Sequence, residues 1–409
     1  MTSPSATDAP ARTSEHAEPG APTFGDLGVS SELVAALAES GIEQPFKIQS
    51  MTIADALAGR DVLGKAKTGS GKTLAFGLPL LDRITRAEPH EPRGLVLVPT
   101  RELANQVKGV LAPLGKVKGL RVKAFYGGVG MDPQVDALRK GVDVVIGTPG
   151  RLIDLIERKE LSVGGVQVLV LDEADRMADM GFLPQVQKIL YGVTAPHQTM
   201  LFSATLDRGI DRLVARYLED PLSHEVESSE ETVEEMHHHF LLVHQMDKVK
   251  VVASIARGVD RTLVFCRTKR GADRLVEQLH RERVRAGAIH GDLRQAARER
   301  ALQDFSDGKL PVLVATDVAA RGIHVDGVDV VIHYDPPEDH KAYLHRSGRT
   351  ARAGEAGVAV MLALWNQENE VRIIQRRLQL NQPIVEIFSN DPRLENLRGW
   401  DPNAEENVA

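Results

Sequence analysis

The chain has 409 residues, with a hydrophobic fraction of 42% and a charged fraction of 26%, which fits two or three soluble domains. Its single cysteine, Cys266, excludes a disulfide within the chain and fits a reducing compartment. We expect a cytoplasmic protein without a membrane span, because residues 1–22 lack the apolar core of a signal peptide and no apolar stretch reaches roughly eighteen residues.

The formal net charge of −7 is unevenly distributed along the chain. Three acidic segments, 1–22, 219–235 and 385–409, carry −2, −8 and −4, which leaves +7 on the remainder. A mildly basic body permits nucleic-acid binding but does not demonstrate it.

The same segments predict the domain boundaries. We expect a disordered N-terminal tail at 1–22, because this segment is rich in Ser, Thr, Pro and Ala. A first domain at 23–220 and a second at 236–382 would flank an acidic linker at 221–235, and residues 383–409 would form a C-terminal tail.

Short apolar runs alternate with stretches of helical spacing in both predicted domains. The runs are GLVLVPT, VDVVIGT, VQVLVLDE and TMLFSAT in the first domain, and TLVFCRT, AGAIHGD, PVLVATD and VDVVIHYD in the second. This alternation predicts an α/β fold in which each domain has a parallel sheet with helices on both faces. Polar residues end every run, so we expect a ligand crevice at the carboxyl ends of the strands.

The sequence AKTGSGKT, from Ala66 to Thr73, follows the run DVLGKA and precedes the helix-like TLAFGLPLL. This is the pattern of a phosphate-binding loop with alanine at its first position, and an ordinary glycine-rich turn is the alternative. Backbone N–H groups around Gly69 and Gly71 would approach phosphate oxygens at the start of the helix. Lys72 would reach the β- and γ-phosphates, and Thr73 would bind Mg²⁺.

Three carboxylates follow the apolar run VLVL, at Asp172, Glu173 and Asp175. An acidic helix start, favoured by the helix dipole, is one explanation for them. With a phosphate loop upstream, Asp172 is instead placed to hold magnesium at the end of its strand, partly through water. Glu173 is then placed to polarise the attacking water as the general base. Together the two motifs predict an ATPase or a GTPase.

The second domain has no phosphate loop, since Leu310 stands where such a loop would need Ser or Thr. It contains HRSGRTARAG, in which Arg346, Arg349 and Arg352 fall near one helical face if the segment is a helix. We expect a candidate arginine finger here, which would stabilise charge on the transferred phosphate when the two domains close. A solvated basic helix start and a contact to a nucleic-acid phosphate are the alternatives.

Six motifs, taken in order, resemble those of the DEAD-box RNA helicase family: AKTGSGKT, PTRELA, TPGR, DEAD, SAT and HRSGRTAR. The resemblance covers about residues 24–380 and implies two RecA-like domains joined by a short linker. It implies an RNA-dependent ATPase that binds ATP and Mg²⁺ between the domains and RNA across both of them. By this resemblance the protein would unwind short RNA duplexes locally or remodel RNA–protein complexes.

The resemblance also assigns roles to individual residues of this sequence, beginning with Gln49, which resembles the glutamine that reads the adenine edge. It assigns nucleotide contacts to Gln49, Ala66, Thr68, Gly69, Ser70, Gly71, Lys72, Thr73, Asp317, Arg349 and Arg352. It assigns the coupling of hydrolysis to domain closure to Asp175, Ser203, Thr205 and His345, with Asp175 facing His345 or its neighbours. It assigns RNA contacts to Pro99, Thr100, Arg101, Gly128, Thr148, Gly150, Arg151, His290, Gly291, Asp292, Gln295, Arg298 and Thr316. We expect these contacts to reach mainly the RNA backbone, so that binding is salt-dependent and largely independent of sequence.

Two positions depart from the family's pattern. Ile42 follows Gly41, where an aromatic residue usually stacks on adenine, and His324 stands where an aspartate usually meets the ribose. Both changes affect the nucleoside and neither affects the phosphates. We therefore predict modest ATP affinity with the hydrolysis chemistry intact.

Several other residues have simple structural interpretations. The three histidines at 237–239 should alternate across a strand, which disfavours a metal site. Cys266 lies in a core-like run, and base stacking by Trp365 or Trp400 is disfavoured in a chain with only 4% aromatic residues.

Three other functions are alternatives to an RNA helicase. An RNA clamp that grips without unwinding is the nearest. A scaffold with vestigial hydrolysis is disfavoured by the intact Lys72, Glu173 and Arg349, and a DNA helicase would not be expected to carry this set of motifs. We expect a monomer, with ribosome assembly and mRNA decay both open as pathways and sources of partners.

Overall fold

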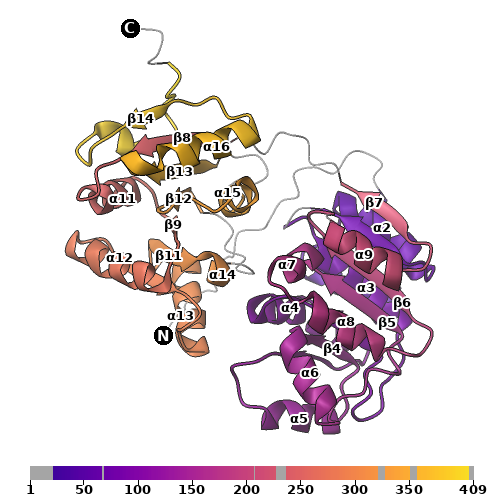
Figure 1. Cartoon of the computed structure of the whole chain (residues 1–409). Coiled ribbons are helices and arrows are strands. Elements are labelled where there is room, and N and C mark those ends of the chain that lie inside the picture. The colour runs from indigo at the N-terminus through magenta and orange to yellow at the C-terminus, as the bar shows by residue number, and fades with distance from the viewer. Residues whose placement is uncertain are drawn as a thin grey trace, which may run out of the picture. The chain divides into compact units, whose positions relative to one another are not determined.

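A computed structural model gives the fold in two compact units, residues 1–228 and 229–409, each built on a seven-stranded sheet (Figure 1). Among the residues it describes, no helix is long and apolar enough to cross a membrane. The described residues are 22–66, 69–206, 208–226, 236–320, 328–350 and 357–404.

The first sheet has the strand order β3-β4-β2-β5-β6-β1-β7, and all neighbouring strands are parallel. Its strands are β1 (Val62–Lys65), β2 (Gly94–Leu97), β3 (Val122–Phe125), β4 (Val144–Gly147), β5 (Val168–Asp172), β6 (Gln198–Ser203) and β7 (Leu222–Glu225). The helices are α1 (Ser31–Glu39), α2 (Lys47–Leu57), α3 (Lys72–Arg83), α4 (Arg101–Val117), α5 (Asp132–Arg139), α6 (Pro149–Glu157), α7 (Ala174–Asp179), α8 (Leu183–Tyr191) and α9 (Arg208–Tyr217).

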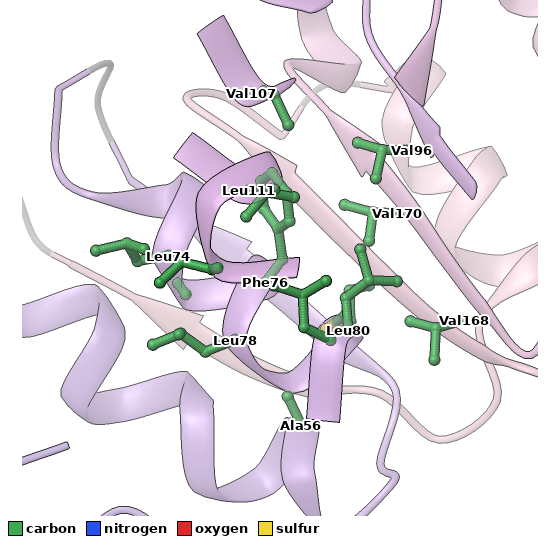
Figure 2. Close-up of a cluster of buried hydrophobic side chains, with 14 of the residues drawn as sticks. Ala56, Leu74, Phe76, Leu78, Leu80, Val96, Val107, Leu111, Val168 and Val170 are labelled. Carbon is green, nitrogen blue, oxygen red and sulfur yellow. The ribbon is translucent and has the colours of Figure 1, made fainter. Parts of the chain in front are cut away.

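Alternate residues of each strand enter two different cores, one on each face of the first sheet. In β5, Val168 and Val170 pack with α1 to α4, whereas Leu169 and Leu171 pack with α5 to α9. Figure 2 shows the first of these cores, where Phe76 of α3 lies among side chains of β2, β5 and α4. Burial on both faces explains why the strands read as unbroken apolar runs.

The second sheet has the order β10-β11-β9-β12-β13-β8-β14 and is also parallel throughout. Its strands are β8 (His237–Leu242), β9 (Thr262–Cys266), β10 (Ala286–Ile289), β11 (Val312–Thr316), β12 (Val330–His333), β13 (Val358–Ala363) and β14 (Ile384–Glu386). Its helices are α11 (Lys248–Arg257), α12 (Lys269–Arg281), α13 (Gln295–Ser306), α14 (Asp317–Ala320), α15 (His340–Ser347) and α16 (Glu368–Leu378), with 3-10 turns η1 (Trp365–Gln367) and η2 (Pro392–Glu395). The prediction of two parallel α/β sheets covered on both faces is confirmed.

The predicted C-terminal tail at 383–409 is wrong over its described part. Residues 384–386 form β14, which extends the second sheet beside β8. Leu394, Leu397 and Trp400 are buried in the apolar cluster that also contains residues of α11 and α12, and the Trp400 ring stacks on His239 with centroids 4.9 Å apart. The segment folds because its few apolar side chains are spaced to reach one apolar face, although its composition is that of a loop.

The predicted linker at 221–235 also begins too early, since residues 222–225 form strand β7 beside β1. The 237–239 histidines lie in β8 as expected: the ring of His238 contacts the Tyr343 hydroxyl at 2.7 Å and that of His239 contacts the Leu397 carbonyl at 2.9 Å. Among the described residues no cluster of His, Cys, Asp and Glu could hold a metal by itself. Cys266 is buried in the core, where burial raises the pKa of its thiol.

Candidate functional site

The described part of the loop between β1 and α3 has the glycine conformations that a phosphate-binding loop needs. Gly69 and Gly71 have φ angles of 86° and 87°, in the left-handed region that favours glycine. Lys72 is the first residue of α3, and its Nζ donates a hydrogen bond of 2.7 Å to the carbonyl oxygen of Ala66. The ammonium group therefore lies against the loop, at a helix N-terminus, where the helix dipole and backbone N–H groups favour anions.

Gln49 connects this loop to the segment that precedes α2. Its Nε2 donates to the carbonyl oxygen of Gly71 at 2.8 Å, and its Oε1 accepts from the backbone N–H of Phe46 at 2.8 Å. Ser70, at the end of the loop, and Thr73, in the first turn of α3, are both half-buried. The described residues of the predicted nucleotide site in the first unit therefore gather at one end of the sheet.

Strand β5 ends in Asp172, a fully buried carboxylate close enough to Lys72 to be attracted by its charge. Burial raises the pKa of Asp172 to about 7, and the attraction to Lys72 opposes that rise. A divalent cation would supply the charge that keeps this carboxylate ionised, so its environment fits a magnesium ligand.

The backbone of Glu173 adopts φ 52°, a left-handed conformation that costs a residue other than glycine on the order of 1 kcal/mol. Its carboxylate forms an ion pair of 3.0 Å with Arg176, and both side chains are buried. Backbone strain of this kind is common at functional sites, where it aims a side chain. The turn carries Glu173 to the carboxyl edge of the sheet, next to Asp172.

Asp175 binds the Ser-Ala-Thr segment that follows β6. Its Oδ2 accepts from the backbone N–H groups of Ala204 and Thr205 at 3.2 and 3.1 Å, and from the Thr205 hydroxyl at 3.3 Å. The Ser203 hydroxyl donates to the Thr205 carbonyl at 2.6 Å. The sequence predicts His345 or its neighbours as the partner of Asp175, whereas these hydrogen bonds lie within the first unit and join two of the three predicted coupling segments.

The predicted RNA contacts of the first unit follow three adjacent strands, β3, β4 and β2. Thr100 caps α4 by accepting from the backbone N–H of Leu103 at 3.3 Å, directly after buried Pro99. Thr148 precedes α6, and a Cβ added to Gly150 in its first turn would meet open space. The register of the parallel strands thus brings these residues to one edge of the sheet.

Arginines line the same edge. The Arg101 guanidinium packs over Gly128, whose φ of 82° suits glycine and where an added Cβ would collide with that group. Arg151 is buried and donates from Nη2 to the Val129 carbonyl at 3.2 Å, while its Nε and Nη1 have no hydrogen-bond partner among the described residues. Burial lowers the pKa of Arg151, and leaving such donors unpaired is costly, so an incoming anion would be stabilised there.

In the second unit the predicted RNA residues follow β10 and β11 or begin α13. His290 contacts Asp273 at 2.8 Å, and Asp292, two residues later beyond Gly291, accepts from Lys269 at 2.5 Å. The other three lie nearby in the fold: Thr316 ends β11, Gln295 begins α13 and bonds Glu299 at 3.0 Å, and Arg298 donates to the Ala319 carbonyl at 3.4 Å. The strands β10 and β11 are neighbours, so this set also gathers at one sheet edge.

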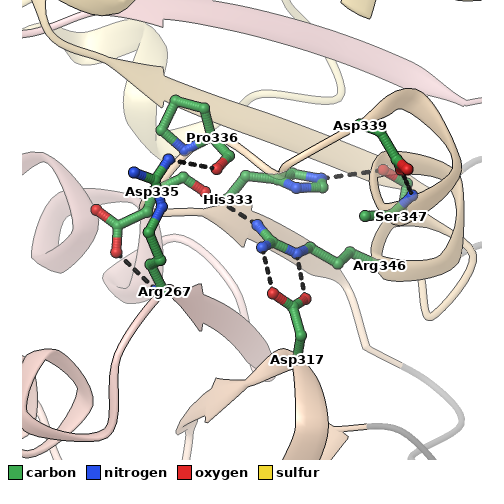
Figure 3. Close-up of polar contacts among 9 residues, drawn as sticks. Arg267, Asp317, His333, Asp335, Pro336, Asp339, Arg346 and Ser347 are labelled. Atoms are coloured by element: carbon green, nitrogen blue, oxygen red, sulfur yellow. Dashed lines mark hydrogen bonds and ion pairs between the residues drawn. The ribbon is translucent and has the colours of Figure 1, made fainter. Parts of the chain in front are cut away.

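Helix α15 holds the first arginine of the HRSGRTAR segment in a buried network (Figure 3). Arg346 forms two hydrogen bonds of 2.6 and 2.7 Å to the carboxylate of Asp317, and a third of 2.9 Å to the Asp335 carbonyl. In the same network, the hydroxyl of Ser347, the next residue of α15, lies 3.0 Å from Nε2 of the buried His333. Asp317, expected to contact the nucleotide, is held here by Arg346.

Arg346 and Arg349 do not share a helical face, because α15 ends at Ser347. Arg349 lies in the turn after the helix, His345 is exposed within it, and Arg352 lies outside the described residues, as do Thr68 and His324. Sequence reasoning missed the structural role of Arg346, as well as Arg176 and Phe46. Phe46 offered a signal, since a large aromatic residue stands where a helix usually begins with Ser, Thr, Asp or Asn.

These features define a two-domain nucleotide-binding protein of the phosphate-loop class, with the loop, the strand-end aspartate and the strained glutamate all in the first unit. The family model for the DEAD/DEAH box helicase matches residues 46–213, and the model for the helicase conserved C-terminal domain matches residues 246–354. The chain belongs to the DEAD/DEAH box helicase family.

Similar proteins from bacteria align with most of the chain. The DEAD-box ATP-dependent RNA helicase CshA of Bacillus cereus is 40% identical over 375 residues, which span 91% of this chain and 71% of the relative. The CshA of Bacillus subtilis is 40% identical over 356 residues, spanning 87% and 72%. Among solved structures, Saccharomyces cerevisiae Dbp5 bound to RNA and ADP BeF3 matches with a TM-score of 0.78 and 28% identity, covering 92% of this chain and 98% of Dbp5.

Proposed function

We propose that this protein is an ATP-dependent RNA helicase, which hydrolyses ATP when RNA is bound and uses closure of its two units to open short RNA duplexes or remodel RNA–protein complexes. The observation that carries this proposal is the meeting of Gln49, the glycine-rich loop with Lys72, and the carboxylates of β5 at one end of a single sheet. Membership of the helicase family and the named relatives support the same activity.

In this proposal the nucleotide phosphates occupy the glycine-rich loop. Lys72 would leave the Ala66 carbonyl and bind the β- and γ-phosphates, where its charge matches the charge that develops during transfer. Thr73 and Asp172 would hold magnesium, partly through water, and the ion would neutralise phosphate charge. Glu173 would orient and deprotonate the attacking water, and Arg176 would keep its carboxylate in place.

The second unit would complete the reaction. Arg349 and Arg352 would stabilise charge on the transferring phosphate, so hydrolysis would require the two units to approach each other. Arg346 is not available for this role while its guanidinium is bound by Asp317. The Arg346–Asp317 pair would instead fix the end of α15, which lies two residues before Arg349.

RNA would bind along the sheet edges that carry Thr100, Arg101 and Arg151 in the first unit, and His290 and Arg298 in the second. Backbone hydrogen-bond donors and arginines suit the phosphate oxygens of any RNA sequence. Binding should therefore weaken steeply as the salt concentration rises.

The test measures ATP hydrolysis by the purified chain with RNA, with DNA and with neither, together with strand release from a short RNA duplex. We expect stimulation by RNA and not by DNA. Glu173→Gln should lower kcat by about 10²–10⁴-fold while ATP still binds, because the amide cannot accept the proton. Equal stimulation by DNA, or hydrolysis that survives the substitution, would contradict the proposal, and stimulated hydrolysis without strand release would favour an RNA clamp.

A further inference from the structure

Phe46 is a large aromatic residue in an unexpected place. It is the residue before α2, a position where a polar side chain usually caps the helix, and the Phe46 side chain makes no such hydrogen bond. Phe46 is 61% exposed, and it belongs to neither of the two apolar clusters of the described first unit. An apolar ring that neither caps the helix nor packs in the core breaks two local rules, which is common at functional positions.

The ring lies against the phosphate loop. A Cβ built on Gly71 would come within 2.5 Å of the Phe46 Cδ2 atom and would also collide with the amide of Gln49. Gln49 in turn bonds both the Gly71 carbonyl and the Phe46 backbone N–H. Phe46, Gln49 and Gly71 therefore form one surface, in which an exposed aromatic face adjoins both the loop and the amide.

We propose that Phe46 is the stacking platform for the purine base of the nucleotide whose phosphates occupy the glycine-rich loop. The proposal rests on the nucleotide site of the proposed function and adds a specificity-determining residue to it. A base offers its π-face to an aromatic ring beside it, and such stacking contributes roughly 1–3 kcal/mol.

The same proposal accounts for Ile42. This side chain is 36% exposed in the same segment but has no aromatic face, so it offers a base only an apolar edge. With Phe46 as the platform, ATP affinity need not be as modest as Ile42 alone predicts. Purine nucleotides should bind more tightly than pyrimidine nucleotides, because a purine covers more of the ring, while Gln49 would distinguish adenine from guanine.

The experiment compares Phe46→Leu with the wild type in the full-length chain, by titration calorimetry with ATP, CTP and inorganic tripolyphosphate. Leucine keeps an apolar side chain and removes the π-face. We expect the Kd for ATP to rise about tenfold, which corresponds to about 1.4 kcal/mol, the Kd for CTP to rise less, and the Kd for tripolyphosphate to change less than about twofold. Phe388→Leu is the matched control, since Phe388 is 53% exposed in the second unit and should leave all three values unchanged.

A second variant separates base stacking from folding. Phe46→Ser supplies a helix cap, which should raise the thermal stability of the first unit, and still removes the ring, so ATP binding should weaken as in Phe46→Leu. Unchanged ATP affinity in both variants, or an equal loss of ATP and tripolyphosphate, would overturn the stacking role. If the wild type binds ATP but RNA does not stimulate hydrolysis, the proposed helicase function is contradicted. The affinities of the Phe46 variants still test the stacking role in that case. A wild type that does not bind ATP would overturn both.

Discussion

The sheets of the two units have the same strand order, so that β1 corresponds to β8 and α3 corresponds to α11. In the first unit the chain leaves β1 through a glycine-rich loop and enters α3 at Lys72. In the second it leaves β8 through residues 243–247 and enters α11 at Lys248, which is also buried. Each sheet thus presents a buried lysine at the same position of the fold.

The surroundings of the two lysines differ. The Lys72 ammonium bonds a loop carbonyl, whereas the Lys248 ammonium lies 4.6 Å from the centre of the Tyr334 ring, and burial lowers the pKa of Lys248 to about 8. Asp247, the residue before α11, accepts hydrogen bonds of 2.7 and 2.8 Å from the backbone and hydroxyl of Ser389. A carboxylate and a covering segment therefore stand where the first unit has a glycine-rich loop, which explains why topology alone does not make a phosphate site.

The largest effect on activity is expected at Lys72, the buried lysine of the first unit. Lys72→Ala should lower kcat/KM for RNA-stimulated ATP hydrolysis by about 10²–10³-fold, because a preorganised charge on the transferring phosphate is lost. Steady-state kinetics with unchanged RNA affinity at low salt would establish this. Retention of more than about a tenth of the activity would contradict the role of Lys72.

The folded C-terminal segment distinguishes the second unit and is tested at Trp400, while Trp365, the other tryptophan of the chain, lies outside it in η1. Trp400→Ala should destabilise the second unit by about 3 kcal/mol, because a buried ring is removed from His239 and the core. Urea unfolding measures the change, followed by the fluorescence of the tryptophan that remains in each variant. Trp365→Ala, at a position 56% exposed, is the control and should cost less than about 1 kcal/mol.

Low pH should destabilise the second unit through two buried histidines. Burial lowers the pKa of His239 to about 4 and that of His333 well below its usual value, with the charge of Arg346 adding to the effect at His333. Both rings are neutral in the folded unit and bind protons on unfolding, so the second unit should lose up to about 1.4 kcal/mol per pH unit for each histidine as the pH falls below about 6.5, towards pH 4 for His239.

In the absence of metal the first unit should respond in the opposite direction at Asp172. Its folded pKa is raised, so the stability that it contributes at low pH is lost as the pH rises towards 7.

The acid unfolding of the second unit can be followed separately by tryptophan fluorescence, because both tryptophans belong to that unit. His239→Phe should flatten its pH dependence and the exposed His244→Gln should not, whereas equal acid sensitivity in both variants would contradict the assignment.

The smallest effect is expected at Lys248. Lys248→Met replaces a desolvated ammonium by an apolar side chain of similar length, so the stability of the second unit should change by less than about 1 kcal/mol. The KM for ATP should stay within about twofold of the wild type. A tenfold rise in KM would mean that the second sheet also contacts the nucleotide at this position.

Much of the fold and of the first unit's site follows from local pattern. Unbroken apolar runs at β2, β4 and β5 predict buried parallel strands because burial on both faces leaves no room for polar residues. The residues 384–404 could not be predicted in this way, since Leu394, Leu397 and Trp400 are separated by Glu, Asn, Arg and Gly, without the spacing of a buried strand. Their burial depends on an apolar face provided by α11 and α12, far away in the sequence.

The sequence by itself determined the phosphate loop, the strand-end carboxylates and the family, because each depends on residue types at short, fixed spacing. The tertiary structure decided the partners: Asp175 binds Thr205, Arg346 binds Asp317, and Phe46 lies against Gly71. These contacts join residues between 25 and 30 positions apart in the sequence, so no local spacing of residue types predicts them. Parallel strands bring their carboxyl ends to one edge of the sheet, so charged side chains that follow different strands come into contact only in the folded unit.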